Sequence, residues 1–364
     1  MAAVLLAGGM ATSLSAQLVP HPVGEQGRTR VLDGPGPFGG TAAGAADTTW
    51  FIHPGLLIVH NTELPSFGND GALWAGRGAN LLADAGVGIR RRSESLTLSA
   101  QFRPAVVFSP NRPFFVFPGT SPGQSAFSSP WNRGAASIDL PLRFGERPIT
   151  EIHLGESFAQ VEWENAELGF STANQWWGPG VRNALVLSDN APGFAHFFVG
   201  TGTPIQTRVG AVGARVLLGS LTESRYFDRD DDNDARSING AFLEFSPARA
   251  PALSVGLARI VIAPVPTAVD AIAHGLDFLT KWQTSPDSVG DGEPPVWRTD
   301  QVTSLFVKWA APTMEVYAEW ARTELPRSLS DLLVTPHASQ GYTVGLQWSN
   351  PVGSVSTPAA VRLQ

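Results

Sequence analysis

A strict alternation of apolar and polar residues is the feature that most limits how this chain can fold. In residues 96–103, LTLSAQFR, the apolar Leu96, Leu98, Ala100 and Phe102 share one face of an extended chain, and the polar residues share the other. A period of two is that of a β-strand with one apolar face. The same period recurs in AQVEWE (159–164), MEVYAEWA (314–321) and YTVGLQWS (342–349). The sequence therefore predicts an all-β, antiparallel protein.

The alternation fits either a soluble sandwich or a barrel in a membrane. No apolar run approaches the ~18 residues that a transmembrane helix needs, but a closed β-barrel also satisfies every backbone polar group in lipid. Several apolar faces end in an aromatic residue, as the girdles of membrane barrels do: Phe102, Trp163, Trp320 and Trp348. The polar faces carry mid-strand charges, as a wet lumen permits. In contrast, ALSVGLARIVIAP (252–264) breaks the alternation at Arg259. Pattern alone leaves a secreted β-sandwich or barrel open.

Composition narrows the class of function. Glycine and proline (38 and 29) are spread along the 364 residues, which fits short strands joined by turns. The chain has no cysteine, which excludes disulfides, thiolate metal sites and cysteine nucleophiles. Its net charge of −7 argues against a nucleic-acid partner.

The N-terminus predicts export. MAAVLLAGGMATSLSAQ has a small apolar run and a small-residue site before Gln17, but no Lys or Arg precedes the run. We expect residues 1–16 to be a signal peptide whose start is clipped or misassigned, followed by a lead segment over 17–46. Residues 47–364 are then expected to form a single β-barrel domain.

Two loops differ from the strand pattern. In TAVDAIAHGLDFLTKW (267–282) the apolar residues fall at helical spacing, which predicts a short helix near 268–282 inserted in a loop. FDRDDDNDAR (227–236) collects five aspartates, but Asn233 and Asn239 stand where a calcium loop needs glycine and glutamate. We interpret the acidic stretch 228–234 as a solvated loop, without a metal.

Catalytic readings have little support. Ser188, Asp189 and His196 are close in sequence, but no Gly-x-Ser-x-Gly elbow holds the serine. Glu162, Glu164 and Glu167 could supply paired carboxylates, although such pairs are also common on lumen-facing strands. We expect no enzyme and no cofactor.

The stretch NQWWGPGVRNALVLSDNAPGF (174–194) places two tryptophans beside a Gly-Pro-Gly turn and several polar side chains. Tryptophan offers a rigid apolar face with one hydrogen-bond donor, so this stretch is suited to stacking on sugar rings. The alternative is a structural corner, in which Trp176 and Trp177 pack on neighbouring strands and Asn183 and Asn190 fix turns.

Residues 169–201, GFSTANQWWGPGVRNALVLSDNAPGFAHFFVGT, resemble the central signature of the Wzi-type capsule-assembly family of outer-membrane proteins. In that family, Trp-Trp-Gly-Pro-Gly is followed by an Asn, an apolar run and a Ser-x-Asn-Ala-Pro-Gly-Phe turn. Further similar stretches extend the resemblance over roughly residues 60–265: NDGALWAGRGAN (69–80), IDLPLRFGERP (138–148), GESFAQVEWENAELGFS (155–171) and YFDRDDDNDARSINGAFLEFSP (226–247). The C-terminal PAAVRLQ departs from the family because it lacks a terminal aromatic residue, which suggests truncation.

The resemblance implies a large antiparallel transmembrane outer-membrane β-barrel of about 16–18 strands that acts as a lectin. Such a protein would bind capsular or exopolysaccharide, lie in outer-membrane lipid as a monomer, and contact the polysaccharide export machinery. The residues expected to bind polysaccharide are Asn174, Gln175, Trp176, Trp177, Arg182, Asn183, Asp189, Asn190 and His196. A porin or substrate channel is the main alternative, because it shares the fold and the location.

Overall fold

The computed structural model describes the chain in several stretches, and all structural statements concern these residues. They are residues 3–5, 48–66, 68–116, 127, 142–180, 183–224, 226, 234–265, 275–280, 300–311, 314–323, 330, 340–350 and 359–363. Apart from residues 3–5, the expected signal peptide and lead segment (1–46) lie outside them. The same holds for most of the acidic loop, 228–233.

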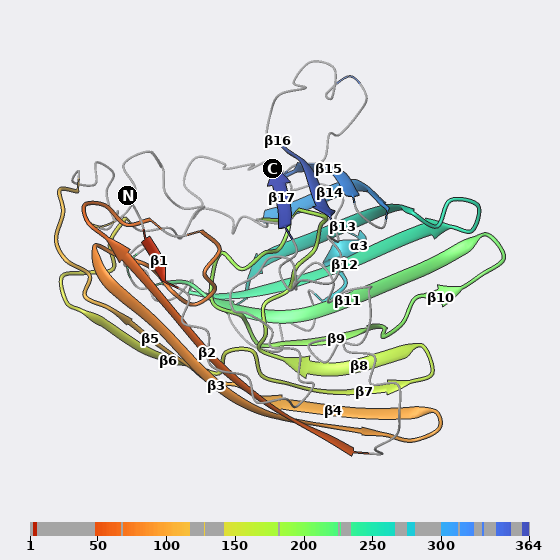
Figure 1. Ribbon diagram of the computed structural model, residues 1–364, viewed down its shortest axis with the longest axis horizontal. Coiled ribbons are helices and arrows are strands. Elements are labelled where there is room, and N and C mark those ends of the chain that lie inside the picture. The colour runs from red at the N-terminus through yellow and green to blue at the C-terminus, as the bar shows by residue number, and fades with distance from the viewer. Residues whose placement is uncertain are drawn as a thin grey trace, which may run out of the picture.

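The described strands form one antiparallel sheet in which most strands pair with their neighbours in the sequence (Figure 1). The first strands are β1 Ala3–Leu5, β2 Thr48–Asn61, β3 Gly78–Arg92, β4 Leu96–Phe102, β5 Ala105–Ser109, β6 Ile149–His153, β7 Phe158–Trp163, β8 Ala166–Ser171 and β9 His196–Thr201. The others are β10 Ile205–Gln206, β11 Gly210–Thr222, β12 Ala235–Pro247, β13 Leu253–Pro264, β14 Asp300–Ala310, β15 Met314–Arg322, β16 Gln340–Asn350 and β17 Ala359–Leu363. The sheet curves, with β2 to β9 along one side and β11 to β17 continuing round it (Figure 1).

Strands β4 and β5 are two parts of one extended segment, separated only by Arg103 and Pro104. Strand β3 pairs with both β4 and β5, and these pair in turn with β7 and β6. The break between β4 and β5 falls at Arg103 and Pro104, opposite Gly155, which has φ of 57° and forms a bridge with Arg103. A side chain at Gly155 would overlap the Arg103 carbonyl, so glycine permits this close approach.

The two faces of the sheet have the reverse of the polarity found in a soluble protein, which we call inverted polarity. Along β4, Leu96, Leu98 and Phe102 are exposed, whereas Ser99 and Gln101 are buried. The same arrangement holds along β16, where Tyr342 and Val344 are each 66% exposed and Thr343 between them is buried. Large apolar side chains therefore cover the outer face, while polar side chains point into the concave interior. The faces assigned from the alternating sequence are confirmed.

Buried charges on the inner face have partners. Arg103 Nε lies 2.5 Å from Asp84 Oδ1 on β3. Arg215 on β11 lies 2.6 Å from Glu167 Oε1 on β8. Lys308 on β14 is 3.7 Å from Glu244 on β12. Burying a charge is costly unless it is paired, so these contacts make a charged interior tolerable.

Arg259 breaks the alternation because a loop covers part of the outer face. Arg259 shares its face of β13 with the exposed Leu257, yet it is buried. Its guanidinium donates to the carbonyl of Phe278 (2.7 Å) and to Gln301 Oε1 (2.7 Å). Phe278 belongs to α3, Asp277–Thr280, which contacts β12 and β13. The loop therefore shields this arginine.

The helix expected near 268–282 is not observed. The structure describes residues 275–280 of this span, and only the four residues of α3 are helical. Here the carbonyl of Phe278 bonds to Arg259, and its side chain is buried. The rest of the expected span, 268–274 and 281–282, lies outside the described residues. Within the described stretches, no helix is long and apolar enough to cross a membrane.

The all-β, antiparallel prediction is confirmed, with 17 strands in the sheet. Closure is not observed, since no described ladder joins β17 to β1 or β2. The connections differ in length at the two ends. Short turns join β3 to β4, β7 to β8, β12 to β13 and β14 to β15. Long connections join β2 to β3, β8 to β9, β13 to β14 and β15 to β16 at the other end. We call these the short-turn end and the long-loop end.

Inward-facing aromatic rings lie over glycines on neighbouring strands. Tyr317 stands opposite Gly345, and Phe306 stands opposite Gly256. A side chain on either glycine would overlap the opposing ring. These pairs fill the interior close to the wall, and such cross-strand packing stabilises register.

We expect Gly345→Ala to lower the free energy of unfolding by about 1–3 kcal/mol, because the new methyl must displace the Tyr317 ring. Gly341→Ala is the matched control on the same strand, since only Leu185 lies near it, at 3.7 Å. Urea unfolding in one detergent measures both variants. Equal stability of the two would contradict this packing.

Candidate functional site

The described residues of the connection between β8 and β9, 172–180 and 183–195, pack against the inner face of the sheet through Trp177. We call this connection the inner loop. The Trp177 N–H donates to the Leu187 carbonyl (3.0 Å), which draws its two arms together. Gly178 has φ of 149°, a conformation that side chains disfavour, and Pro179 follows it. The Gly-Pro-Gly sequence thus permits the sharp turn that sends the loop inward.

Trp177 anchors the inner loop to the wall. It is fully buried and packs in an apolar cluster that reaches across five strands. Its partners in the cluster are Phe198, Leu217, Ile238, Phe242, Ala258, Ile260 and Phe306. The Trp177 and Phe242 ring centroids are 5.9 Å apart. The indole is therefore core packing, with no face open to a ligand.

Trp176 is also buried, at 2% exposure, and its indole N–H donates to the Gly180 carbonyl (2.9 Å) within the same turn. The burial of both tryptophans favours the structural-corner alternative over stacking platforms.

Gln175 joins the loop to a charged pair on the wall. Its Oε1 accepts from Arg215 Nη1 at 3.2 Å. The same guanidinium donates twice to Glu167 Oε1, at 2.6 and 2.9 Å, and lies 4.7 Å from the Phe198 ring centroid. One arginine thus ties together β8, β9, β11 and the inner loop.

Asn174 and His196 close the two ends of the loop. The backbone N–H of Asn174 donates to Glu156 Oε1 (3.2 Å), and its side-chain amide donates to the Ala191 carbonyl (3.1 Å). His196 is buried, and its Nδ1 donates to the Phe194 carbonyl at 2.7 Å. The imidazole is therefore held by its own segment of chain.

The tip of the loop reaches two distant parts of the molecule. The Leu185 N–H donates to Glu319 Oε2 on β15 (3.1 Å). On another side, the Gly71 N–H donates to the Asp189 carbonyl (2.8 Å), which fastens the loop to the connection between β2 and β3. The inner loop therefore acts as a strut across the interior.

The expected binding residues divide into two groups. Asn174, Gln175, Trp176, Trp177 and His196 are buried and hold the loop in place. Asn183 and Asn190 are exposed, and Asp189 is half-buried. Arg182 lies outside the described residues. The exposed polar members are the ones within reach of a ligand.

Several residues that matter here were missed from sequence, notably Arg215, Glu319 and Glu156. The only sequence signal of Arg215 and Glu319 is a charge on the polar face of a strand, and Glu156 lies in the connection between β6 and β7. The candidate pair Glu162 and Glu167 does lie directly opposite in register. However, Glu167 binds Arg215, and Glu162 accepts from Gln160 (2.7 Å).

In the described stretches, no group of acidic and histidine residues could hold a metal ion. Asp228, Asp230 and Asp232 of the acidic loop fall outside those stretches.

Residues 90–263 match the family model described as capsule assembly protein Wzi. These residues belong to the Wzi capsule-assembly family. The match runs from the end of β3 to β13 and includes the whole inner loop. It confirms the resemblance found in the sequence over most of its expected extent. No curated protein matches the chain.

We expect Trp177→Ala to lower the free energy of unfolding by about 3–5 kcal/mol, as large-to-small core changes do. Asn190→Ala, in the same loop but exposed, should change it by less than about 0.5 kcal/mol. Denaturant unfolding compares them. If Trp177→Ala left stability unchanged and removed only polysaccharide binding, the indole would be a ligand platform instead.

Proposed function

We propose that this protein is an outer-membrane β-barrel that binds capsular or exopolysaccharide and helps to assemble it on the cell surface. The observation that carries the proposal is the capsule-assembly match over residues 90–263, which falls on a sheet with an apolar outer face and a polar interior. A soluble sandwich would place these faces the other way round.

The membrane position is supported by the outer face. Leu218, Leu243, Leu257 and Leu305 are all exposed on long neighbouring strands, as lipid-facing residues would be. Exposed aromatic residues such as Trp163 (62%) and Trp50 (71%) fit an interfacial girdle. In lipid an open sheet edge is costly, so we propose that the edges of the sheet meet to close a barrel.

The unequal connections suggest an orientation. Outer-membrane barrels have short turns on the periplasmic side and longer loops outside. By that rule the long-loop end faces the cell exterior. The inner loop begins and ends at the long-loop end, where an exported polymer would meet it.

The exposed polar side of the inner loop is the proposed binding surface. Asn183 and Asn190 offer amide donors and acceptors, and Asp189 offers a carboxylate, all of which can bond sugar hydroxyls. The loop is already fixed by Trp177 and Glu319, so little entropy would be lost when a polymer binds.

Binding is favoured over transport because the loop and its apolar cluster occupy the interior. An open porin would need that space for water. Conductance measured in planar bilayers distinguishes these functions. A stable, large conductance from the folded full-length chain would contradict the lectin function and support a channel.

We expect Leu305→Arg, in the middle of an outer face, to reduce folding stability in lipid vesicles by about 2–4 kcal/mol. Val209→Arg should have little effect, because this exposed residue lies in the turn before β11 at the short-turn end. Equal losses for both, or a folded protein without any detergent or lipid, would contradict the membrane position.

We expect the double variant Asn183→Ala/Asn190→Ala to remain folded but to bind the host's purified surface polysaccharide about tenfold more weakly, which corresponds to ~1.4 kcal/mol. Gln206→Ala is the control, since it removes an exposed amide at the short-turn end. Isothermal titration of refolded protein measures both. Saturable binding that is equal in both variants would move the site elsewhere, and no binding by the wild type would overturn the lectin.

A further inference from the structure

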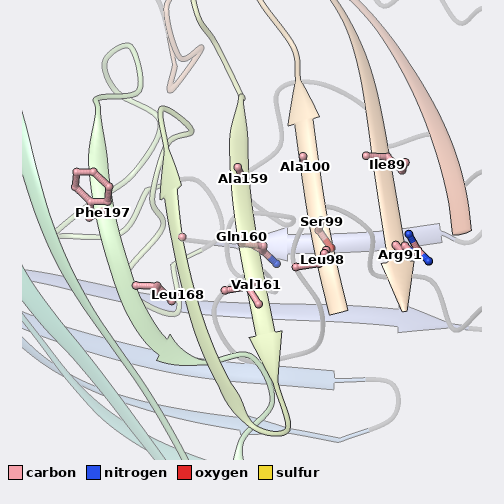
Figure 2. Close-up of a pocket in the computed structure, with 11 residues that line it drawn as sticks. Ile89, Arg91, Leu98, Ser99, Ala100, Ala159, Gln160, Val161, Leu168 and Phe197 are labelled. Carbon is pink, nitrogen blue, oxygen red and sulfur yellow. The ribbon is translucent and has the colours of Figure 1, made fainter. Parts of the chain in front are cut away.

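The outer face carries a hollow of about 630 Å³ on the strands β3, β4, β7, β8 and β9 (Figure 2). Its size falls within the ~300–1,000 Å³ of typical small-ligand sites. Most of its lining residues are apolar, and the others are Ser99, Gln160 and one charged residue, Arg91.

Two alanines create the hollow. Along one row of the outer face, Ile89 pairs with Ala100, Ala100 with Ala159, and Ala159 with Phe170, which in turn pairs with Phe197. Large residues thus flank two adjacent methyl groups, and a notch opens between them. The next row, with Leu98, Val161 and Leu168, borders the notch toward the short-turn end.

Arg91 stands at the edge of this notch. It pairs with Leu98 and is the penultimate residue of β3, so it lies at the short-turn end. Figure 2 shows it beside Leu98, near the end of its strand. Its side chain is exposed, and no described carboxylate forms an ion pair with it. Trp163, an exposed girdle residue, lies close to the same level, opposite Leu96.

We propose that this hollow binds one phospholipid, with an acyl chain in the notch and the phosphate at Arg91. An arginine next to an apolar surface at the interface can bury its stem and direct its guanidinium to the headgroups. The charge of Arg91 complements a phosphate, while the notch complements a hydrocarbon chain. Because Arg91 lies at the short-turn end, the lipid belongs to the leaflet on that side.

This inference rests on the proposed membrane position, but it goes beyond polysaccharide binding. It makes the protein selective for a phospholipid at one place on its apolar outer face. The notch lies within the residues that match the Wzi family, from 90 to 263, apart from Ile89 at its edge.

The test titrates phosphatidylglycerol into the folded full-length chain in detergent and follows the first bound lipid by native mass spectrometry. Ala159→Leu fills the notch and should weaken this lipid about tenfold. Ala318→Leu is the matched control, an alanine on the same outer face of β15, and should bind within twofold of the wild type.

The headgroup is tested separately. Arg91→Gln should weaken phosphatidylglycerol several-fold without changing the binding of diacylglycerol, which has no phosphate. Arg92→Gln, the next residue but on the opposite face, should leave both lipids unchanged.

Equal affinities for Ala159→Leu and Ala318→Leu would overturn the lipid site. If Leu305→Arg still impaired folding in vesicles, the proposed membrane position would be supported and only the lipid site would be contradicted. If Leu305→Arg had no effect, the membrane position and the lipid site would both be contradicted. Loss of phosphatidylglycerol and diacylglycerol binding alike in Arg91→Gln would also contradict the phosphate contact.

Discussion

The inverted polarity of the sheet is the constraint on which the rest of the structure depends. A wall with leucine and valine outside and charged residues inside must satisfy those inner charges without bulk water. The ion pairs Arg103–Asp84 and Arg215–Glu167 do this across strands that are distant in sequence. Aromatic rings over glycines, as at Tyr317 and Gly345, fill the remaining space near the wall. Pairing and packing together allow a polar interior to be dense.

The inner loop is also held by a combination of packing and hydrogen bonds. Trp177 completes an apolar cluster on one part of the wall. Elsewhere the loop is held by hydrogen bonds to Glu319 and Gly71. A segment fixed at several points presents its exposed amides in a constant geometry. The residues that make the family signature conspicuous thus support the site, and the less conspicuous Asn183 and Asn190 are the proposed contacts with sugar.

The sequence predicted which residues face each way along β4 and β16, because a period of two translates directly into two faces. It offered the burial of Trp177 as one of two interpretations but could not decide between them, because partners such as Phe306 lie more than a hundred positions away. Arg259 broke the pattern for a similar reason, since its partner Phe278 reaches it through a loop. Contacts between residues far apart in the sequence leave no periodic signal. The geometry of the candidate site depends on such contacts more than the strand pattern of the fold does.

The most direct test of the inverted sheet is the lipid exposure of neighbouring residues on one strand. The chain has no cysteine, so Tyr342→Cys, Thr343→Cys and Val344→Cys each give one site for a nitroxide label. Relaxation by oxygen, which concentrates in lipid, and by a water-soluble nickel complex is measured in vesicles. We expect high oxygen and low nickel accessibility at 342 and 344, and low accessibility to both reagents at 343, which faces the packed interior. A lack of alternation, or exposure of 342 and 344 to the nickel complex, would contradict the account.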